Sequence, residues 1–499
     1  MSRTPSAAAE VASSPEPLSR TERPLFVDLD GTLISGDVTQ ESVLAAIKRD
    51  PLTLLRLPGL LVRGRATMKR ALAHQVMPDV QVLPYRQELL EFIRQERRAG
   101  RRVVLATASD RLYAESVAAA VDLFDDVLAS DGHKNLKGAN KLVAIQEYCR
   151  RHGYSEFAYA GDALADVPIW RAAAEVHVVA PGPLVQRAAE QLNKPLHVHV
   201  RQRGSARAVW RALRPIQWVK NVLLFVPLLM AHEIGNTQKL LACCLAFVAF
   251  SACASAIYVL NDLLDIEADR HHPIKRQRPF ASGALPIYYG PLLVVACIAF
   301  GATLSWLFLP IAFAAYLGAY LVVNCLYSFW LKQKLVLDVL LLAGMYVLRI
   351  IMGGVAAELV VSEWLMALSM FLFTSLAFAK RHAELARLSE EDQRQARGRG
   401  YRVEDLGIIE TVGPTSGYLA VLVLALYINS ENTTMRQLYT YPRALWLICP
   451  LLMYWITRLW FVVKRRELNE DPVMYALRDR VGILVGCLIL LLAILASKF

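Results

Sequence analysis

The sequence predicts two domains: an α/β domain with a parallel sheet, followed by an all-helical bundle that crosses a membrane about nine times. Two observations support this fold class. Residues 1–200 have the composition of a soluble protein, whereas residues 218–499 contain repeated apolar runs long enough to cross a bilayer. Within the first part, short apolar strands alternate with helical stretches, which is the pattern of a parallel α/β sheet.

Composition and charge set the expected boundaries. Residues 1–23 are rich in Ala, Ser and Pro and have no apolar core, so we expect a disordered tail and not a signal peptide. We then expect the α/β domain over residues 24–185, a linker over 186–206 and the membrane domain over 207–499. Basic loops on the cytoplasmic side of a membrane protein explain the net charge of +11, so we expect no nucleic-acid partner.

Three apolar strands of the first domain each end in polar residues. They are PLFVDLDGTL (24–33), RRVVLATAS (101–109) and EFAYAGDALADVP (156–168). The carboxyl ends of parallel strands lie at one edge of a sheet, and functional groups gather there. One DxD motif is weak evidence, but three polar clusters in this order are strong evidence for a catalytic site.

This order of motifs resembles the haloacid dehalogenase-like family over residues 24–185. The resemblance implies a phosphatase with six motif residues: Asp28, Asp30, Thr107, Lys141, Asp162 and Asp166. Asp28 would take the phosphoryl group, and Asp30 would protonate the leaving oxygen. Thr107 and Lys141 would hold phosphate oxygens. Asp28, Asp162 and Asp166 would hold Mg²⁺, which offsets the charge of the transferring group.

Three features of this domain allow alternatives. Lys137 competes with Lys141 for the lysine role, but a helix is expected to begin at Lys141. The domain could be inactive and structural, although no motif residue is missing. Residues 34–100 predict a small helical cap, in which Leu alternates with Arg and Lys over residues 51–73. We interpret that stretch as an amphipathic core helix, and the alternative is a helix on the bilayer surface.

Nine apolar runs in the second half are candidate membrane spans. They lie at about 218–232, 240–260, 290–309, 311–330, 335–357, 364–379, 412–428, 443–463 and 481–497. The loops on one side of these runs contain eighteen Lys and Arg residues, and the loops on the other side contain three. The positive-inside rule places the basic loops, and with them the α/β domain, in the cytoplasm. We therefore expect a multi-pass protein of the inner (plasma) membrane.

A dense group of carboxylates follows the second apolar run, in NDLLDIEADRHHPIKRQRP (261–279). Asp262, Asp265 and Asp269 have helical spacing, so they can share one helix face. Like charges this close are unfavourable unless a cation bridges them. Mg²⁺ commonly binds through carboxylates together with substrate phosphates. The segment therefore predicts a Mg²⁺–diphosphate site at the membrane surface, whereas a solvated stop-transfer loop would need no acids.

This segment resembles the first aspartate-rich motif, NDxxDxxxD, of the UbiA family of intramembrane prenyltransferases, and the resemblance covers residues 207–499. It implies a helical bundle that holds a diphosphate through Mg²⁺. The second aspartate-rich motif of ring-modifying members is missing, because the corresponding loop reads AKRHAELARLSEED. The acidic segment 261–279, together with YSFWLK, RIIMGGVA, KRHAEL and ALRDR, resembles the decaprenyl-phosphate phosphoribosyltransferase branch of the family. That branch serves arabinan precursor synthesis. That branch implies 5-phosphoribosyl diphosphate as donor and a polyprenyl phosphate as acceptor.

The resemblance also implies residue roles. Asp262, Asp265 and Asp269 would hold Mg²⁺, with Asp262 and Asp265 essential for catalysis, and Asn261 would orient the site. The residues expected to contact phosphates are Lys220, Lys275, Arg278, Tyr327, Lys332 and Lys380. Asp338 and Arg478 are weaker candidates. Asp338 lies one turn inside an apolar run, where a carboxylate suggests function, and an ion pair with Arg349 is the alternative.

These motifs favour one function over two alternatives. The leading hypothesis is a Mg²⁺-dependent enzyme that joins phosphoribose to a polyprenyl phosphate, with a phosphatase that removes the 5-phosphate. The alternative enzyme transfers a prenyl group from a polyprenyl diphosphate to an aromatic acceptor, and the missing second acidic motif argues against it. A transporter or lipid-binding scaffold would not need two separate Mg²⁺–phosphate sites.

Overall fold

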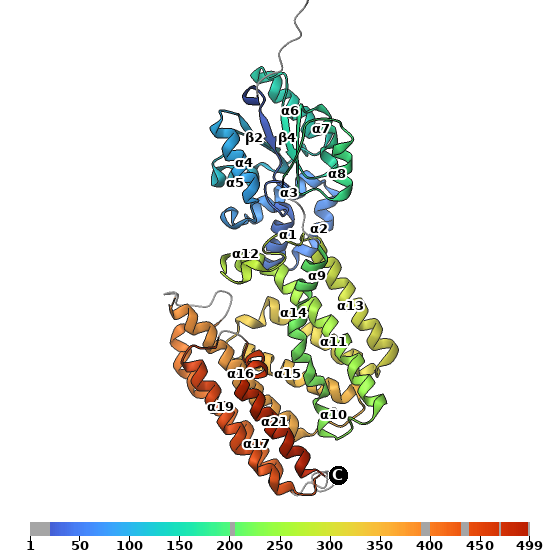
Figure 1. Cartoon of the computed structure of the whole chain (residues 1–499), viewed down its shortest axis with the longest axis vertical. Coiled ribbons are helices and arrows are strands. Elements are labelled where there is room, and N and C mark those ends of the chain that lie inside the picture. The colour runs from blue at the N-terminus through green and yellow to red at the C-terminus, as the bar shows by residue number, and fades with distance from the viewer. Residues whose placement is uncertain (1–19, 200–204, 391–399, 431–438, 469–470, 498–499) are drawn as a thin grey trace, which may run out of the picture. The chain divides into compact units, whose positions relative to one another are not determined.

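The computed structural model describes residues 20–199, 205–390, 400–430, 439–468 and 471–497 (Figure 1). These residues form two compact units. The first comprises the described residues up to Val209 together with Asp262–Tyr289, and the second comprises Trp210–Asn261 and Gly290 onwards. The segment with the acidic motif thus belongs to the first unit. Most of the predicted tail, residues 1–23, lies outside the described residues.

The first unit contains a six-stranded parallel sheet with the order β3-β2-β1-β4-β5-β6. The strands are β1 (Leu25–Val27), β2 (Val103–Asp110), β3 (Asp126–Ser130), β4 (Ala158–Gly161), β5 (Glu175–Val179) and β6 (Leu196–His199). The central strand β1 pairs with β2 and β4, so that Leu25 lies opposite Val103 and Ala158. The prediction of a parallel α/β domain is confirmed.

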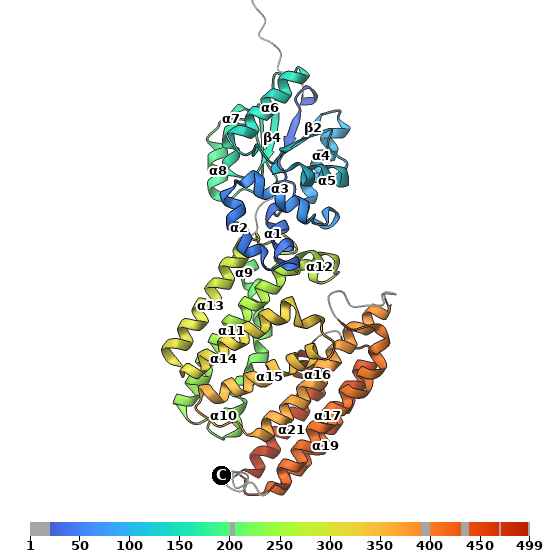
Figure 2. The same ribbon diagram turned by 180° about the vertical axis from the view of Figure 1, so that it is seen from behind.

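Helices cover both faces of this sheet (Figures 1 and 2). The helices α4 (Gln87–Arg98) and α5 (Arg111–Val121) lie on one face. The other face is covered by α6 (Ala139–His152), α7 (Val167–Ala172) and α8 (Pro183–Glu190). Successive β1 side chains enter opposite cores, because strand side chains alternate between faces. Leu25 and Val27 pack in one core and Phe26 packs in the other.

The predicted linker over residues 186–206 is too long. Helix α8 continues to Glu190, and β6 pairs in parallel with β5, with Val176 opposite Leu196. The strand sequence LHVH has two histidines and no apolar run, so its composition does not distinguish a short edge strand from a linker. The α/β domain therefore extends to His199, and residues 200–204 lie outside the described residues.

The predicted helical cap consists of α1 (Val38–Arg49), α2 (Thr53–Val62) and α3 (Arg65–Gln75). The interpretation of its leucine-rich stretch as a core helix is wrong for α2, in which only Thr53 is buried. Leu55 is 76% exposed and Val62 is 89% exposed. An apolar helix with this much exposed surface is what a protein or membrane contact requires.

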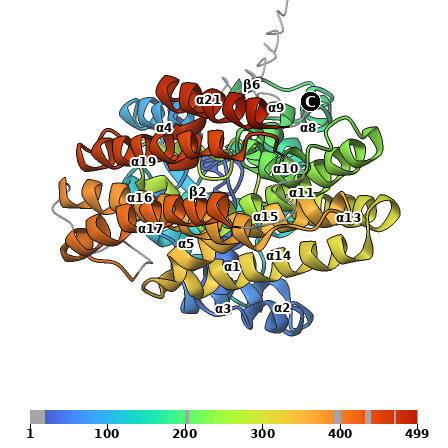
Figure 3. The same ribbon diagram turned by 90° about the horizontal axis from the view of Figure 1, so that it is seen from below.

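The second unit is helical (Figure 3). Its helices are η4 (Pro215–Phe225), α10 (Val226–Met230), α11 (Thr237–Leu264), α13 (Tyr289–Phe308), α14 (Ile311–Phe329), α15 (Leu337–Ala356), α16 (Glu363–Glu390), α17 (Leu406–Asn429), α19 (Ile448–Lys464), α20 (Pro472–Arg478) and α21 (Arg480–Ala496). Helix α9 (Ser205–Leu213) leads into this unit, and the last three residues of α11 belong to the first.

Seven helical segments among the described residues are long and apolar enough to cross a membrane. The other two predicted spans, 218–232 and 481–497, correspond to the shorter apolar helices Pro215–Met230 and Arg480–Ala496. A helix of 17 residues is about 25 Å long, somewhat less than the hydrocarbon core of a typical bilayer. The prediction of an all-helical membrane bundle is confirmed, and nine is an approximate number of spans.

Arg101 joins the start of β2 to β5 through a buried ion-pair network. Its guanidinium contacts Glu96 at 2.6 Å and Glu175 at 2.9 Å, and its side chain is 1% exposed. We expect Arg101→Met to destabilise the α/β domain by about 3–5 kcal/mol, because the buried Glu175 and the partly buried Glu96 would lose this cation. The neighbouring Arg102→Met is the control, since its pair with Asp126 is exposed and contributes about 1 kcal/mol or less. Hydrogen exchange of β1 and β2 in the full chain measures both changes, and equal protection in the two variants would contradict the expectation.

Candidate active sites

The carboxyl edge of the sheet gathers the motif residues predicted for the first domain. Asp28 directly follows β1, and Asp162 directly follows β4. Asp28, Asp162 and Asp166 each offer one carboxylate oxygen, and these atoms all lie within 4.8 Å of one another. In the part of the chain that the structure describes, this is the only such group of three or more potential metal ligands.

Lys141 supplies positive charge to this group. It lies in the first turn of α6, which begins at Ala139, two residues before the predicted start, and its Nζ is 2.8 Å from Asp28 Oδ2 and 3.9 Å from Asp166 Oδ1. Burial acts to lower the pKa of Lys141, but the charges of Asp28 and Asp166 raise it above its usual value. The ammonium therefore stays charged. Lys137 is exposed, so the structure brings Lys141 and not Lys137 to the motif aspartates.

Asp30 lies in the turn after β1 and is held by two donors. Its carboxylate accepts hydrogen bonds from Ser109 Oγ and, at 2.8 Å, from the Val38 backbone N–H. Burial and the negative charges of Asp37 and Asp28 raise the pKa of Asp30 to about 8. A carboxyl group that keeps its proton near neutral pH can donate it to a leaving oxygen. Thr107 is fully buried, and its Oγ1 accepts a 3.0 Å hydrogen bond from Ser109 N.

The crowding of carboxylates indicates where a cation would bind. Burial and the charges of Asp28 and Asp166 raise the pKa of Asp162 to about 7. Burial likewise raises the pKa of Asp166 to about 6, against the opposing effect of Lys141. Because nearby like charges disfavour ionisation, a divalent cation with oxygen ligands would stabilise all three charged forms. Three carboxylates form a donor set that fits Mg²⁺.

Sequence reasoning missed two residues of this site, Tyr159 and Ser109. The Tyr159 hydroxyl accepts from Lys141 Nζ at 2.9 Å and donates to Asp166 Oδ1 at 3.0 Å. Tyr159 lies in an apolar stretch of the sequence, which predicts a core residue rather than a site residue. Ser109 ends the ATAS stretch, two residues after Thr107. Its hydroxyl at a strand end could have identified it as a further candidate site residue.

The three aspartates of the acidic motif do not share one continuous helix, so that expectation is wrong. Helix α11 ends at Leu264, and Asp265 is the N-cap of α12 (Ile266–His271), with φ −105° and ψ 13°. Asp262 lies in the last turn of α11 and Asp269 lies within α12. Because the helix breaks at Asp265, the three aspartates do not lie on one face of a single helix.

Arg278 connects two of these aspartates. Its Nη1 is 3.2 Å from Asp262 Oδ1 and 2.6 Å from Asp269 Oδ2, and both aspartates are buried. Asp265 instead pairs with Lys48 of α1 at 3.0 Å. Burial raises the pKa of Asp269 although Arg278 acts to lower it. The structure thus brings Asp262, Asp269 and Arg278 together, and it pairs Asp265 with a different cation, Lys48. The expected metal-binding role of the three aspartates stays a prediction.

In the second unit, two predicted phosphate-binding lysines converge on one carboxylate that sequence reasoning missed. Asp471 Oδ2 is 2.9 Å from Lys220 Nζ in η4 and 3.1 Å from Lys380 Nζ in α16. Burial acts to raise the pKa of Asp471, but Lys380 and Lys220 lower it below its usual value. The available signal was the acidic stretch before Pro472 in an otherwise basic loop.

Asp338 pairs with Arg381 of α16, so the alternative pairing with Arg349 is wrong. Arg381 Nε is 2.6 Å from Asp338 Oδ2, and its Nη2 donates to the Tyr327 hydroxyl at 3.1 Å. Arg349 donates to Asn221 Oδ1 at 3.1 Å and to a backbone carbonyl one turn earlier. Tyr327 and Asp338 are therefore joined by one buried guanidinium.

The remaining predicted residues lie at the ends of helices. Asn261 Oδ1 accepts a 2.7 Å hydrogen bond from Ser328 Oγ. Lys275 lies in η5 (Lys275–Gln277) and Arg478 ends α20, and both are exposed. Lys332 is half-buried in η6 (Leu331–Gln333). Their roles in phosphate binding stay predictions.

Comparisons with known proteins give the two halves of the chain separate relatives. Residues 222–479, just over half of the chain, match the UbiA prenyltransferase family, and residues 25–171 match the haloacid dehalogenase-like hydrolases. A Sinorhizobium fredii protein, named only as uncharacterized protein y4nM, is 36% identical over 93% of this chain and 89% of its own length. The two-domain organisation therefore matches over nearly the whole chain.

Two further matches concern the membrane half. The decaprenyl-phosphate phosphoribosyltransferase of Corynebacterium glutamicum is 41% identical over 178 residues, which are 35% of this chain and 54% of that protein. The solved structure of a UbiA homolog from Archaeoglobus fulgidus, bound to DMAPP and Mg²⁺, is 16% identical and covers 57% of this chain and 96% of that one, with a TM-score of 0.43.

Gly31 directly follows Asp30 in the chain and lies close to Asp162. Its φ is +77°, and a Cβ added there would lie 2.1 Å from Asp162 Oδ2. We expect Gly31→Ala to displace this carboxylate and raise the Mg²⁺ concentration needed for half-maximal hydrolysis of p-nitrophenyl phosphate by about tenfold, because displaced ligands weaken metal sites.

Gly100→Ala is the matched control for this prediction. Gly100 has a φ of +86°, but nothing lies within 4 Å of its added Cβ. Both variants therefore carry the backbone strain of a non-glycine residue with positive φ, about 1–2 kcal/mol. Only the methyl group added at Gly31 contacts Asp162. An equal change in Mg²⁺ dependence in the two variants would show that the strain, and not the displaced carboxylate, is responsible.

Proposed function

Because the chain belongs to the UbiA prenyltransferase family and also carries a haloacid dehalogenase-like hydrolase domain, we propose that it is a membrane enzyme with two successive activities. The membrane domain transfers a 5-phosphoribosyl group from 5-phosphoribosyl diphosphate to a polyprenyl phosphate. The hydrolase domain then removes the 5-phosphate from the lipid-linked product. Both reactions act on phosphate groups and use Mg²⁺.

The observation that carries the transferase proposal is the cationic character of the membrane domain. Lys220 and Lys380 share Asp471, and Arg381 lies one residue after Lys380. The stretch that starts with Lys380 replaces the second acidic motif of ring-modifying members. A donor with a diphosphate and an additional 5-phosphate needs more cations than a prenyl diphosphate does, and charge-assisted hydrogen bonds to phosphate are strong. The similarity to decaprenyl-phosphate phosphoribosyltransferases supports the same donor.

The transfer step follows from these groups. A phosphate oxygen of the polyprenyl phosphate attacks C1 of the ribosyl donor, the C1–O bond to the diphosphate breaks, and the diphosphate leaves with the bonding electrons. In the second unit, Lys220 and Lys380 would offset negative charge on substrate phosphate groups. In the first unit, Arg278 contacts Asp262 and Asp269. Asp262 and Asp269 would hold Mg²⁺, and the ion would supply further positive charge for the diphosphate.

The hydrolysis step uses the first domain. Asp28 attacks the phosphorus of the 5-phosphate, and Asp30 gives its proton to the leaving 5-oxygen, as its raised pKa allows. Lys141 and Thr107 hold the phosphoryl oxygens. Water then cleaves the aspartyl phosphate and releases inorganic phosphate, and Asp30 takes back a proton from that water.

The fusion of the two activities has a physical advantage. The product of the first reaction stays in the membrane, and tethering holds the second site at an effective concentration in the millimolar range. The exposed leucines of α2 give the cap an apolar surface that suits the bilayer interface. These features support a lipid-linked phosphate as the substrate of the hydrolase domain.

Product analysis tests both activities in one experiment. Purified full-length protein receives labelled 5-phosphoribosyl diphosphate, a polyprenyl phosphate and Mg²⁺. We expect wild-type protein to release mainly the dephosphorylated ribosyl lipid, Asp28→Asn to accumulate the 5-phosphorylated lipid, and Asp262→Asn to form neither. EDTA should abolish both products, because both sites require a divalent cation.

The controls separate the two proposals. A labelled lipid product that keeps its 5-phosphate in wild-type protein would show that the hydrolase domain has another substrate. Absence of any ribosyl lipid, with transfer from a polyprenyl diphosphate to an aromatic acceptor instead, would overturn the proposed donor. Asp122→Asn, which alters an exposed carboxylate at the C-cap of α5, should leave both reactions unchanged.

The charge bias of the loops gives a separate prediction about sidedness. We propose that the α/β domain faces the cytoplasm and that the loop of residues 358–363 faces the opposite side. In a chain without the exposed Cys244 and Cys487, a membrane-impermeant thiol reagent added outside cells should label Ser362→Cys and not Glu115→Cys. Labelling of Glu115→Cys in intact cells would refute this orientation.

A further inference from the structure

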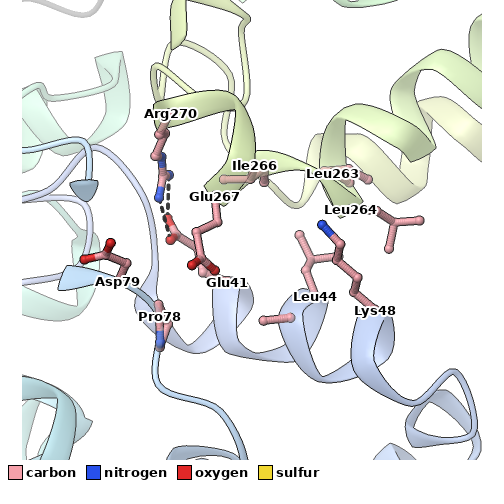
Figure 4. A pocket seen from close by; sticks show the side chains of 11 residues that line it. Glu41, Leu44, Lys48, Pro78, Asp79, Leu263, Leu264, Ile266, Glu267 and Arg270 are labelled. Atoms are coloured by element: carbon pink, nitrogen blue, oxygen red, sulfur yellow. Dashed lines mark hydrogen bonds and ion pairs between the residues drawn. The ribbon is translucent and has the colours of Figure 1, made fainter. Parts of the chain in front are cut away.

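The acidic motif is held by the cap of the hydrolase domain. Residues 262–289 belong to the same compact unit as the α/β domain. Arg270 of α12 makes two hydrogen bonds of 2.8 Å with the carboxylate of Glu41 in α1 (Figure 4). Both side chains are 6% exposed. A buried, bidentate arginine–carboxylate pair has a defined geometry, so it fixes α12 relative to α1.

Further contacts surround this pair. Lys48, two turns after Glu41 in α1, contacts Asp265 at 3.0 Å. His271 contacts Asp79 at 3.2 Å. Figure 4 shows that Leu44 of α1 faces the pocket that Leu263 and Leu264 also line. The cap therefore contacts the motif on both sides of the helix break.

The position of the pair connects it to the predicted metal site. Arg270 directly follows Asp269, and its Nε also donates to the Ala281 carbonyl at 2.9 Å, which joins α12 to the end of the loop. The same loop brings Arg278 to Asp269 and Asp262. A shift of α12 would therefore move Asp269 away from Asp262. Misplacement of a reacting group by about 1 Å is enough to reduce a rate by about a hundredfold.

We propose that α1 of the hydrolase cap is a positioning element of the transferase, which rests on the function proposed above. The Glu41–Arg270 pair holds α12 so that Asp262 and Asp269 present their carboxylates together. Neither Glu41 nor Arg270 touches the reacting atoms. The hydrolase domain thus acts on the lipid-linked product and also supports the geometry of the site that makes it.

Single and paired variants of the full-length protein test this role. We expect Glu41→Gln and Arg270→Gln each to raise KM for 5-phosphoribosyl diphosphate, and the Mg²⁺ concentration for half-maximal transfer, by about tenfold or more. Hydrolysis of p-nitrophenyl phosphate should stay within about twofold of wild type, since the pair contacts no group of that site. The exchanged pair Glu41→Arg with Arg270→Glu should recover part of the lost transfer, which a purely local effect of either substitution would not do.

Hydrogen exchange gives a readout that does not depend on the donor. In Glu41→Gln we expect faster exchange over Ile266–His271 and unchanged exchange in β1 and β2. Glu115→Gln is the matched control, because it removes an ion pair with Arg111 that is exposed and 3.9 Å long. Its transfer and its exchange should match those of the wild type.

The outcomes separate this proposal from the proposed function. Unchanged exchange over α12 in Glu41→Gln would overturn the positioning role, whatever the donor is. Parallel loss of p-nitrophenyl phosphate hydrolysis would also overturn it, because the pair would then support the whole unit. If α12 exchanges faster in Glu41→Gln but wild-type protein makes no ribosyl lipid, the positioning role stands and the assigned donor fails.

Discussion

The arrangement of charged groups in both units depends on one constraint, which is that crowded, buried carboxylates need nearby cations. Asp28, Asp162 and Asp166 lie within 4.8 Å of one another, and Lys141 alone does not offset three negative charges. The raised pKa values of Asp162 and Asp166 express this deficit. A divalent cation removes the deficit, and it also prepares the site for a phosphate. The crowding that costs free energy in the protein alone would therefore favour binding of a divalent cation.

The acidic motif meets the same constraint with protein cations. Arg278 compensates Asp262 and Asp269, Lys48 compensates Asp265, and Arg270 pairs with Glu41. In the second unit Asp471 lies between two lysines. Ion pairs in partly buried places are sensitive to the removal of one partner. The ion pairs of Lys48 and Arg270 therefore connect the acidic motif to α1 of the hydrolase cap.

The fold was predictable where it depends on local sequence patterns, such as apolar runs and the polar residues that end them. The apolar strands that end in polar residues predicted the sheet and the site at its edge, because the carboxyl ends of parallel strands lie at one edge of the sheet. The edge strand β6 was not predictable, since LHVH has little apolar character and is a strand only through its pairing with β5. The leucines of α2 were assigned to a core, but burial depends on which partner a helix meets, and α2 leaves them exposed.

By itself, the sequence determined the two-domain class and the membrane helices. It also predicted that Asp28, Asp162 and Asp166 lie together at the carboxyl edge of the sheet, because each follows the end of a parallel strand. Only the tertiary structure decided the ion-pair partners: Asp338 with Arg381, Asp471 with Lys220 and Lys380, and Glu41 with Arg270. These partners are separated by tens to hundreds of residues. Long-range pairing of charges depends on how elements pack, and local sequence carries no record of it.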